Sequence, residues 1–241
     1  MTSIHIKKLS IIIPVYNEEI TIQQVVLDHI ACIDEIKSQF QDWEIICLDD
    51  ASTDKTASIL SSLSARYPQV RIVTHSKNQG INSSFQELAL AASGDWIYHT
   101  ASDGQWPASN LKRLLLKAEK ESLDFVIGVR PNRKQVYSWW RLILSHGFNW
   151  LPQFFFGVET KDVNGIKFGR KEIFRISLRS KSFFGEIERV LEAVKQGYRI
   201  GHETIEFLPR GHGKASGAKW KYIIRTAYDF LSYLVLNLVK R

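Results

Sequence analysis

The stretch Leu9–Glu19, "LSIIIPVYNEE", decides the fold that the sequence predicts. Its first seven residues form a short apolar run of the kind that fills a buried strand, and a polar loop follows at once. From Glu18 to Ile36 the apolar residues recur with helical spacing. Strand, loop and helix in this order begin a βαβ unit, so we expect a largely parallel sheet with the loop at its carboxyl edge.

The same alternation continues along the chain. Further strands are expected at Glu44–Leu48, Val70–Thr74, Trp96–His99 and Phe125–Val129, near Asn164–Phe168, and at Arg199–Phe207. Further helices are expected at Asp54–Arg66, Ile81–Ala92, Ser109–Glu121 and Phe184–Gln196, followed by a C-terminal helical arm. The pattern predicts one α/β domain with an appended arm.

Composition and charge limit the class of protein. Hydrophobic residues at 44% and charged residues at 24% are typical of a globular chain, and the net charge is +7, from 32 basic and 25 acidic residues. This charge admits nucleic acid, an anionic membrane or a phosphorylated small substrate as a partner. Cys32 and Cys47 lack metal-site spacing, so we expect buried, reduced thiols in a cytosolic protein. The run "LSIIIPV" is too short for a signal peptide, and no spanning helix is expected.

Three polar loops follow predicted strands: "PVYNEE", "DDASTD" and "ASDGQWP". Each alone is also typical of a plain turn, in which Asn17 would cap a helix and Glu18 would favour its dipole. Because ligands of parallel sheets gather at the carboxyl ends of the strands, the three loops together predict a binding site.

These motifs resemble a known family. In order, "LSIIIPVYNEE", "EIICLDDASTDKT", "NQGINSSFQELALAASGDW" and "ASDGQWP" are similar to the nucleotide-sugar domain of family 2 inverting glycosyltransferases. "FVIGVR", "WWRLILS", "KDVNGIKFGRKEIF" and "PRGHGKAS" resemble its polyprenyl-phosphate branch, which includes dolichol-phosphate mannosyltransferase. The resemblance covers roughly residues 9–216 and implies a Rossmann-like GT-A fold, with a mostly parallel sheet and helices on both faces.

The resemblance also implies a division of the chain. A GT-A domain over 1–215 would comprise a nucleotide-sugar half of about 1–129 and an acceptor half of about 130–215. The C-terminal arm over 216–241 would lie at a membrane surface or pack on the domain or on a partner.

Site residues follow from the resemblance by position. The nucleotide-sugar side would comprise Pro14, Tyr16, Glu18, Leu48, Asp50, Ala101, Ser102, Asp103 and Gln105. Asp103 and Gln105 fall on the positions that bind a divalent metal, Mg²⁺ or Mn²⁺. The catalytic set would be Asp103 with Arg130, Arg141 and Arg210, whose arginines hold donor or acceptor phosphates. The acceptor side would comprise Asp162 and Gly165 with Arg141 and Arg210, although "DVNGIKF" departs from the Gly-Phe pair of many members.

Ala101 stands where a second acid would complete a two-carboxylate metal clamp. A divalent ion bridging the diphosphate would stabilise the charge that grows on the leaving oxygen. With one carboxylate fewer, the protein should bind metal mainly together with the donor's phosphates. The alternative is that Ala101 marks a noncatalytic descendant of such an enzyme.

The second half of the chain is basic and aromatic. Residues 130–158 contain no acid, and "YSWWRLILSHGFNWLPQFFF" over 137–156 is rich in Trp, Tyr and Phe. Three interpretations stay open: a buried core, a membrane-interface segment, which we favour, and a single-strand nucleic-acid surface, which no recognisable motif supports. In the arm, Lys219, Lys221 and Arg225 precede an apolar run that Asp229 interrupts. Glu186 and Glu188 are expected to be exposed structural residues.

The leading functional hypothesis is inverting transfer of a hexose or N-acetylhexosamine from a UDP- or GDP-sugar to polyprenyl phosphate. The planar fork of arginine suits a phosphate acceptor. We expect a cytoplasmic enzyme attached peripherally to the membrane surface, with a membrane-protein partner as a further expectation and nucleic acid excluded. The alternatives are a glycan acceptor and a noncatalytic membrane-associated subunit.

Overall fold

A seven-stranded sheet organises the part of the chain that the computed structural model describes, residues 4–131, 150–180, 182–209 and 220–238. The strands are β1 (Ile6–Val15), β2 (Phe40–Asp49), β3 (Val70–Thr74), β4 (Trp96–His99), β5 (Phe125–Val129), β6 (Lys167–Arg170) and β7 (Ile200–Thr204). Their order across the sheet is β3-β2-β1-β4-β6-β5-β7.

Strand direction explains where a ligand site can form. β6 runs antiparallel to both of its neighbours, β4 and β5, while the other strand pairs are parallel. The six parallel strands therefore end at one edge of the sheet, and the reversed β6 begins at that same edge. In register, His99 at the end of β4 lies opposite Lys167 at the start of β6. Residues just before β6 thus join the loops that follow the parallel strands.

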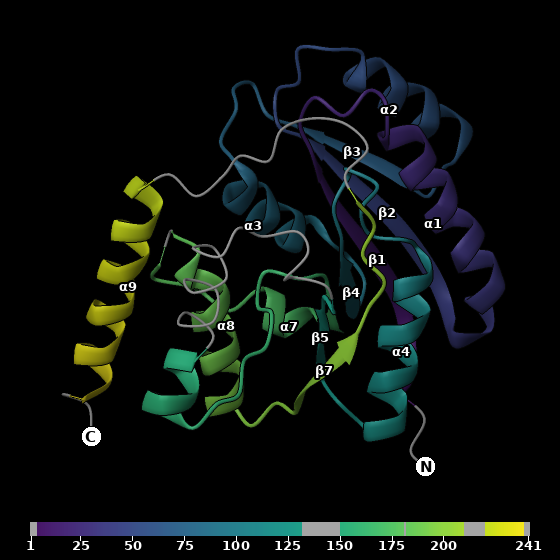
Figure 1. Cartoon of the computed structure of the whole chain (residues 1–241). Helices are drawn as coiled ribbons and strands as arrows, with labels where there is room; N and C mark the ends of the chain where they lie inside the picture. Colours follow the sequence, from purple (N-terminus) through teal and green to yellow (C-terminus); the bar gives the residue numbers. More distant parts are fainter. Residues whose placement is uncertain (1–3, 132–149, 181, 210–219, 239–241) are drawn as a thin grey trace.

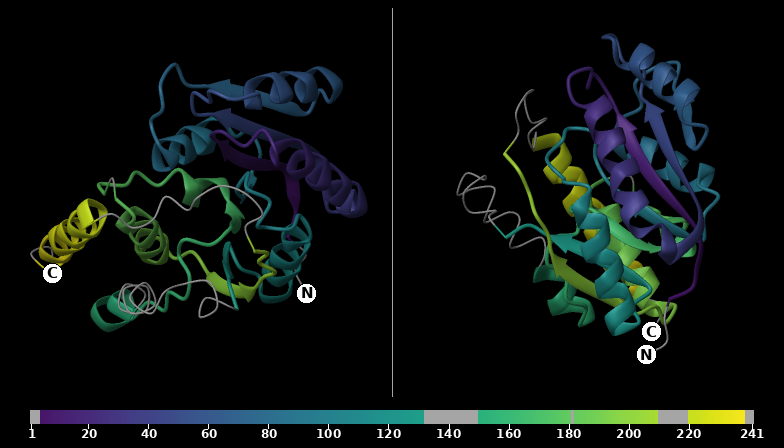
Figure 2. Two further views of the ribbon diagram at one scale, coloured as in Figure 1. Left: turned by 45° about the horizontal axis from the view of Figure 1, so that its top comes forward. Right: turned by 90° about the vertical axis from the view of Figure 1, so that its right-hand side faces the viewer.

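Helices cover both faces of the sheet (Figures 1 and 2). They are α1 (Ile22–Ile36), a 3-10 turn η1 (Lys37–Gln39), α2 (Thr56–Arg66), α3 (Ile81–Ala91), α4 (Ser109–Glu121), α7 (Lys171–Phe174), α8 (Phe184–Lys195) and α9 (Trp220–Leu238). Residues 150–156 are also helical. One face packs against α1, α2 and α4 and the other against α3, α7 and α8, while α9 lies outside α8.

Two cores follow from the alternation of side chains along the strands. On β1, Ile11 and Ile13 pack into one core and Ile12 into the other, and all three are fully buried or nearly so. This two-sided burial is why β1 is an almost continuous apolar run. The predicted buried thiols are confirmed: Cys32 and Cys47 are free and buried, and burial raises the pKa of Cys47 to about 12.

Some predicted boundaries are wrong. Helix α1 begins at Ile22 rather than Glu18, and α2 begins at Thr56 rather than Asp54, because Glu18, Glu19 and Asp54 form hydrogen bonds between the two loops. β6 lies at Lys167–Arg170, later than the predicted 164–168, and β7 ends at Thr204.

Among the described residues, no helix is long and apolar enough to cross a bilayer. The proposed division into 1–129, 130–215 and 216–241 stays a prediction.

Candidate functional site

The loops after β1 and β2 are locked together at the carboxyl edge of the sheet. Asn17 donates its backbone N–H to Ser52 Oγ over 2.9 Å, and its side-chain Oδ1 accepts the N–H of Thr53 over 2.8 Å. Glu19 is linked in the same way in both directions to the Asp54–Lys55 segment. The plain-turn interpretation of the sequence has Asn17 capping a helix. In the structure Asn17 instead joins the two loops, and α1 has no side-chain cap. This bracing gives the edge a fixed shape.

The loop after β4, which carries Asp103, is attached to the same assembly. Thr21 Oγ1 lies 2.8 Å from the carbonyl oxygen of Ser102 and 2.9 Å from Glu18 Oε2, and its single proton serves one of them at a time. Asp103 Oδ1 accepts the N–H of Gln105 over 3.1 Å, and Gly104 between them has a φ of 71°, a backbone that favours glycine. The three predicted loops are thus joined by hydrogen bonds, and Asp103 is partly exposed in the third of them.

Gln105 connects this loop to the segment after β7. Its carbonyl oxygen accepts the N–H of Leu208 over 2.9 Å, and its side-chain Nε2 donates to the Leu208 carbonyl over 3.0 Å. Asn110 of α4 makes a matching two-way connection to Glu206. Gln105 is buried and its amide nitrogen is used structurally, so any contact with a metal would come from its amide oxygen, and that role stays a prediction.

Arg130 and Asp162 form a nearly buried ion pair at the same edge. Arg130 donates through Nε and Nη2 to the two carboxylate oxygens of Asp162, each over 2.8 Å, and its backbone N–H donates as well. The guanidinium lies against the rings of Trp106 and Phe207, at 5.5 and 5.4 Å from their centroids. Bidentate pairing fixes the orientation of the arginine. Asp162 therefore holds a predicted phosphate-binding arginine in place.

Gly165 allows the chain before β6 to approach β5 closely. A Cβ atom at this position would lie 2.1 Å from the carbonyl oxygen of Gly128. The N–H of Gly165 donates to the carbonyl of Asp162 over 2.8 Å, which closes the turn that carries the ion pair. The role of Gly165 on the acceptor side stays a prediction. Its role in packing is shown by the close approach to Gly128.

Asp50 is a structural hub. Its buried carboxylate accepts the backbone N–H groups of Gln79 and Gly80, each over 2.8 Å, at the start of α3. It also lies 2.6 Å from Nδ1 of His75, whose Nε2 is 2.9 Å from Glu87. Hydrogen bonding from Asp50, reinforced by Glu87, outweighs desolvation and raises the pKa of His75. The loops after β2 and β3 are thereby joined to α3.

A largely buried charged cluster lies beside His99, at the end of β4 from which the Asp103 loop continues. Lys167 is 1% exposed, and its Nζ donates to Gly165 O and pairs with Glu186, each over 3.0 Å. Arg189 lies 3.8 Å from Glu186 and donates to the carbonyls of α7. Burial and these two cations hold the pKa of His99 well below its usual value, so His99 is neutral near pH 7. Burial raises the pKa of Glu186, but Lys167 and Arg189 outweigh it and keep the carboxylate charged.

The remaining predicted positions are placed as follows. The side chains of Pro14 and Leu48 are buried, so they would border a nucleotide only through their main chain. Tyr16 is 46% exposed beside Asn17 and is open to solvent. Arg141 and Arg210 lie outside the described residues.

One side-chain prediction is wrong. Glu186 and Glu188 were expected on an exposed surface, but Glu188 is 2% exposed and accepts the N–H groups of Arg179 and Ser180. Glu188 is structural, as expected, whereas Glu186 is partly buried, with its side chain 22% exposed, and pairs with the buried Lys167.

Sequence reasoning missed several residues of this edge. His75 directly follows β3, as the predicted loops follow their strands, and this position was the available signal. Lys167, the first residue of β6, is a cation between Ile166 and Phe168, and a cation between two apolar residues is also a signal in the sequence. Trp106 and Phe207 gave no signal, because their contact with Arg130 joins distant segments.

The donor set for a metal consists of one carboxylate. In the described residues, no three His, Cys, Asp or Glu side chains gather closely enough to hold an ion. Asp103 is partly exposed in the loop after β4. A single carboxylate fits a hard divalent cation whose other ligands are diphosphate oxygens and water.

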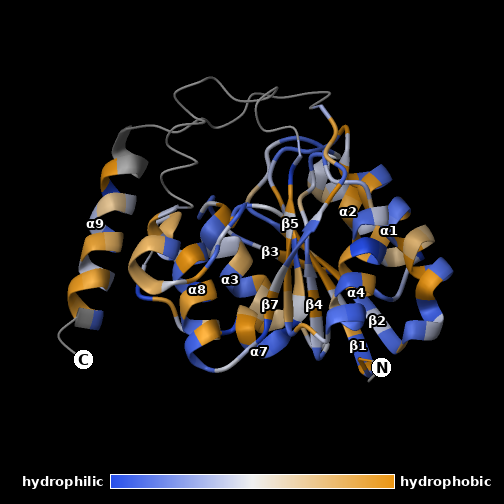
Figure 3. Ribbon diagram, turned by 60° about the horizontal axis from the view of Figure 1, so that its bottom comes forward, coloured by the Kyte–Doolittle hydropathy of each residue, from blue (hydrophilic) through white to orange (hydrophobic). Residues whose placement is uncertain are grey.

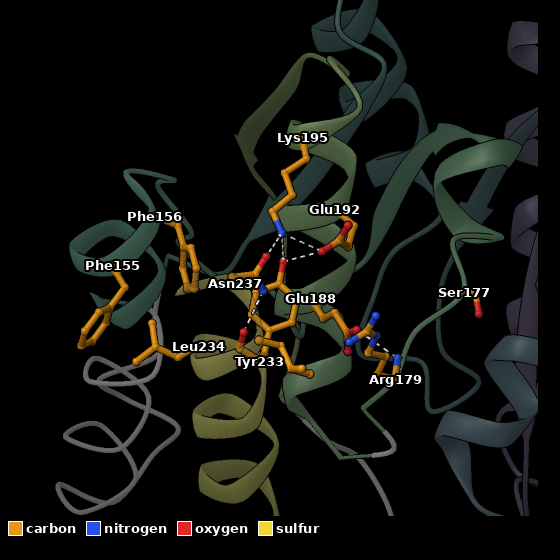
Figure 4. A pocket seen from close by; sticks show the side chains of 11 residues that line it. Phe155, Phe156, Ser177, Arg179, Glu188, Glu192, Lys195, Tyr233, Leu234 and Asn237 are labelled. Atoms are coloured by element: carbon orange, nitrogen blue, oxygen red, sulfur yellow. Dashed lines mark hydrogen bonds and ion pairs between the residues drawn. The ribbon is translucent and has the colours of Figure 1, made fainter. Parts of the chain in front are cut away.

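Two pockets occur among the described residues. One, of about 350 Å³, lies between α1 and the start of α4, and its wall includes Gly104 and Trp106 of the Asp103 loop and Leu208 of the segment joined to that loop. The larger, of about 560 Å³, lies beside α8 and α9 (Figure 4). We place the site at the loops because the larger pocket shares no residue with them.

Known proteins match this architecture. A family model described as glycosyl transferase family 2 matches residues 10–178. Solved structures of glucosyl-3-phosphoglycerate synthase from Mycobacterium tuberculosis are similar. The complex with Mn²⁺, UDP and phosphoglyceric acid has a TM-score of 0.68 and 17% identity, covering 95% of this chain and 78% of that chain. The complex with Mg²⁺ and UDP has a TM-score of 0.64 and 15% identity, covering 94% and 79%. The likeness confirms the predicted GT-A-like fold.

Proposed function

Because the chain belongs to glycosyl transferase family 2, we propose that this glycosyltransferase moves a sugar from a UDP- or GDP-sugar to polyprenyl phosphate with inversion. The observation that carries the proposal is the set of hydrogen bonds that joins the loops after β1, β2 and β4, together with the contact of Trp106 from the Asp103 loop with Arg130 of the Arg130–Asp162 pair. It supports a role of Asp103 in holding a donor-bound metal and of Arg130 in contacting a phosphate. The complexes of the mycobacterial enzyme with UDP and Mn²⁺ or Mg²⁺ support a nucleotide-sugar donor and a divalent metal.

The donor half of the mechanism follows from the loops. When bound, Mg²⁺ or Mn²⁺ held by Asp103 and the donor's phosphates would neutralise charge on the departing diphosphate. The braced loops hold Asp103 without reorganisation, which is the condition for electrostatic stabilisation of a transition state. Gln105 fixes the loop through Leu208, and Asp50 orders the start of α3 at the same edge.

The acceptor half rests on cations. A lipid monophosphate carries roughly 1.5 or more negative charges near neutral pH if it titrates like phosphoserine. It needs little help from a general base but requires positive charge at the point of attack. Arg130, Arg141 and Arg210 would supply that charge, with Asp162 and Gly165 shaping the acceptor side. The acid-free stretch 130–158 supports an anionic acceptor.

Two alternatives have specific support. A soluble phosphorylated acceptor is favoured by the phosphoglyceric acid in the mycobacterial complexes. A noncatalytic subunit is favoured by Ala101, which leaves one acid in the loop. A glycan acceptor is the third possibility for the same fold.

A product assay separates these possibilities. Radiolabelled UDP- and GDP-sugars are incubated with the protein, polyprenyl phosphate and Mn²⁺ or Mg²⁺, and label is measured in the organic extract after mild acid. We expect an acid-labile lipid product from one donor. Label in a water-soluble product instead would replace the lipid acceptor, and no labelled product from any donor and acceptor would favour the noncatalytic subunit.

A matched pair of variants links the product to the proposed site. Asp103→Ala should lower the rate by at least about 100-fold, because it removes a group that acts on charge developing in the transition state. Asp34→Ala, an exposed acid on α1, should leave the rate unchanged. Equal rates for the two variants would contradict the role of Asp103.

The proposed acceptor also implies a location. We propose that the protein is cytoplasmic and attached peripherally to a membrane surface, with a membrane protein as a further partner. Nucleic acid is not part of this proposal.

A further inference from the structure

Helix α9 turns an apolar row of side chains away from the domain. Ile224, Tyr228, Leu231 and Val235 are each more than half exposed, between 57% and 70%. Their spacing of four, three and four residues places them on one helix face, over roughly 16 Å at 1.5 Å per residue. Figure 3 shows α9 as the outermost element of its side of the molecule. We call this row the outer stripe.

The opposite side of α9 fixes its orientation. Phe230 and Tyr233 are buried, and both rings contact Phe184 of α8, with centroids 5.6 and 5.5 Å apart. Lys195 of α8 donates to Tyr233 Oη over 2.7 Å and to Asn237 over 2.6 Å (Figure 4). The helix is therefore held by one face, and the outer stripe is exposed because of that packing.

The single acid of α9 also faces inward. Asp229 accepts the backbone N–H of Ser182 over 3.2 Å. The exposed residues described between 224 and 237 are six apolar or aromatic residues and one arginine, Arg225. Asp229, which interrupted the apolar run in the sequence, thus does not interrupt the exposed surface.

A second exposed apolar group lies next to α9. Trp150, Phe154 and Phe155 are 54%, 63% and 40% exposed, and Trp150 stacks on Phe154 at 4.7 Å between centroids. Phe155 contacts the buried Phe230 of α9 at 5.6 Å, so this group lies beside the helix. Exposed apolar side chains gathered in this way mark an interaction site on a protein surface.

We propose that the outer stripe and this aromatic group bind the surface of an anionic bilayer, with α9 lying in the plane of the interface. Aromatic residues and cations both favour the headgroup boundary. Arg225 lies beside the stripe, and the sequence places Lys219, Lys221, Lys240 and Arg241 at its two ends. Anionic headgroups complement this charge.

Charge argues against a second copy of the chain as the occupant. An isologous contact through α9 would set the helices antiparallel across the symmetry axis, with each start against the other end. Because both ends carry cations in the sequence, like charges would meet. A bilayer surface avoids that repulsion.

This inference rests on the proposed function, in which the enzyme works at a membrane surface. Vesicles that lack polyprenyl phosphate test membrane binding separately from sugar transfer. The full chain is mixed with vesicles of phosphatidylcholine, or of phosphatidylcholine with a quarter phosphatidylglycerol, and bound protein is measured by co-sedimentation. We expect binding to the anionic vesicles that weakens at high salt, because screening acts on the cation contribution.

Two leucines on helices provide matched variants. Leu231 and Leu116 are 57% and 53% exposed, on α9 and α4 respectively. Leu231→Asp should lower vesicle binding at least tenfold, while Leu116→Asp, with the same change of charge, should bind like the wild type. Unchanged melting temperatures would show that both variants fold.

Three results would overturn the inference: no binding of the wild type to anionic vesicles, equal binding by the two variants, or a lipid-free dimer that Leu231→Asp dissociates. The last would assign the surface to a second copy. Sugar transfer to a short, water-soluble polyprenyl phosphate should be the same in both variants. If the wild type transfers no sugar to this acceptor, the proposed function is contradicted, whereas the proposed binding of α9 to membranes is not.

Discussion

Single residues in the interlocked loops adopt backbone conformations that side chains disfavour. Asn17 has a φ of 54° and Ala51 a φ of 60°, both in the left-handed region. Asparagine tolerates this region, whereas for other side-chain residues it costs roughly 1–2 kcal/mol. Ala51 lies between Asp50 and Ser52, both of which bond across the edge, so the loop shape outweighs this cost.

Replacing Ala51 with glycine should relieve the strain. We expect Ala51→Gly to raise the free energy of unfolding by up to about 1 kcal/mol, after the greater freedom of glycine in the unfolded chain is subtracted. Ala57→Gly, at an exposed position within α2, should lower it by about 1 kcal/mol. Urea unfolding measures both, and a loss of stability in Ala51→Gly would show that the backbone there is not strained.

The pairing of His75 predicts a pH dependence. The charged groups facing it are Asp50, from the loop after β2, and Glu87, from α3. Because its folded pKa lies above the unfolded value of 6.5, the stabilisation is fully present below that value and is lost as pH rises through the folded pKa.

Unfolding measured from about pH 5.5 to pH 9 tests this prediction. The free energy of unfolding of the wild type should fall as pH rises through this window, partly because His75 loses its proton. His75→Gln should remove that part of the fall. A variant with the same slope as the wild type would assign that slope to other groups.

At the scale of elements, the ion pair between Arg130 and Asp162 joins the end of β5 to the turn before β6. Their side chains are 11% and 3% exposed, so removing one partner leaves a largely buried charge. Arg130→Ala and Asp162→Ala should each lower the free energy of unfolding by about 3 kcal/mol or more.

A double-mutant cycle should give a coupling of about 1–3 kcal/mol for this pair. The more solvent-accessible Lys117–Glu121 pair of α4, at 2.6 Å and with side chains 23% and 45% exposed, should give only about 0.3–0.5 kcal/mol. Equal couplings would contradict the structural role of the Arg130–Asp162 pair.

The sequence predicts best those elements whose pattern of apolar and polar residues can be recognised within the element itself. β4 and β5 occur at the predicted residues, because a short apolar run bounded by polar turns is typical of a strand buried on both faces. β3 also occurs at the predicted residues, although it is an edge strand and only Val70 in it is buried. The start of α1 was misplaced because Asn17 and Glu19 bond to residues about 35 positions away. The reversed direction of β6 was not predictable from its own sequence.

In the candidate site, too, the local features were predictable from the sequence and the contacts between distant segments were not. The three loops were predictable because strand ends converge in a parallel sheet. The partners of Gln105 and Asp50 were not, because Leu208 and His75 reach them only in the folded chain.

For the whole molecule, the single carboxylate of the Asp103 loop predicts that metal and donor bind together. Mn²⁺ alone should barely shift the melting temperature, UDP alone should raise it modestly, and the two together should raise it by more than the sum. A ligand that binds the folded state stabilises it by mass action. Asp103→Asn should remove the extra shift and keep the effect of UDP, and tight Mn²⁺ binding without UDP would contradict this prediction.

The Arg130–Asp162 pair closes a chain segment at the carboxyl edge of the sheet, with its two ends held 2.8 Å apart. For a flexible loop with joined ends, doubling the length costs only about 0.6 kcal/mol of closure entropy. The helix at 150–156 limits this freedom, because Phe155 and Phe156 pack against Phe230 and Tyr233 of α9. Insertions and deletions between the paired residues should therefore be tolerated only where they preserve that helix and its contacts with α9.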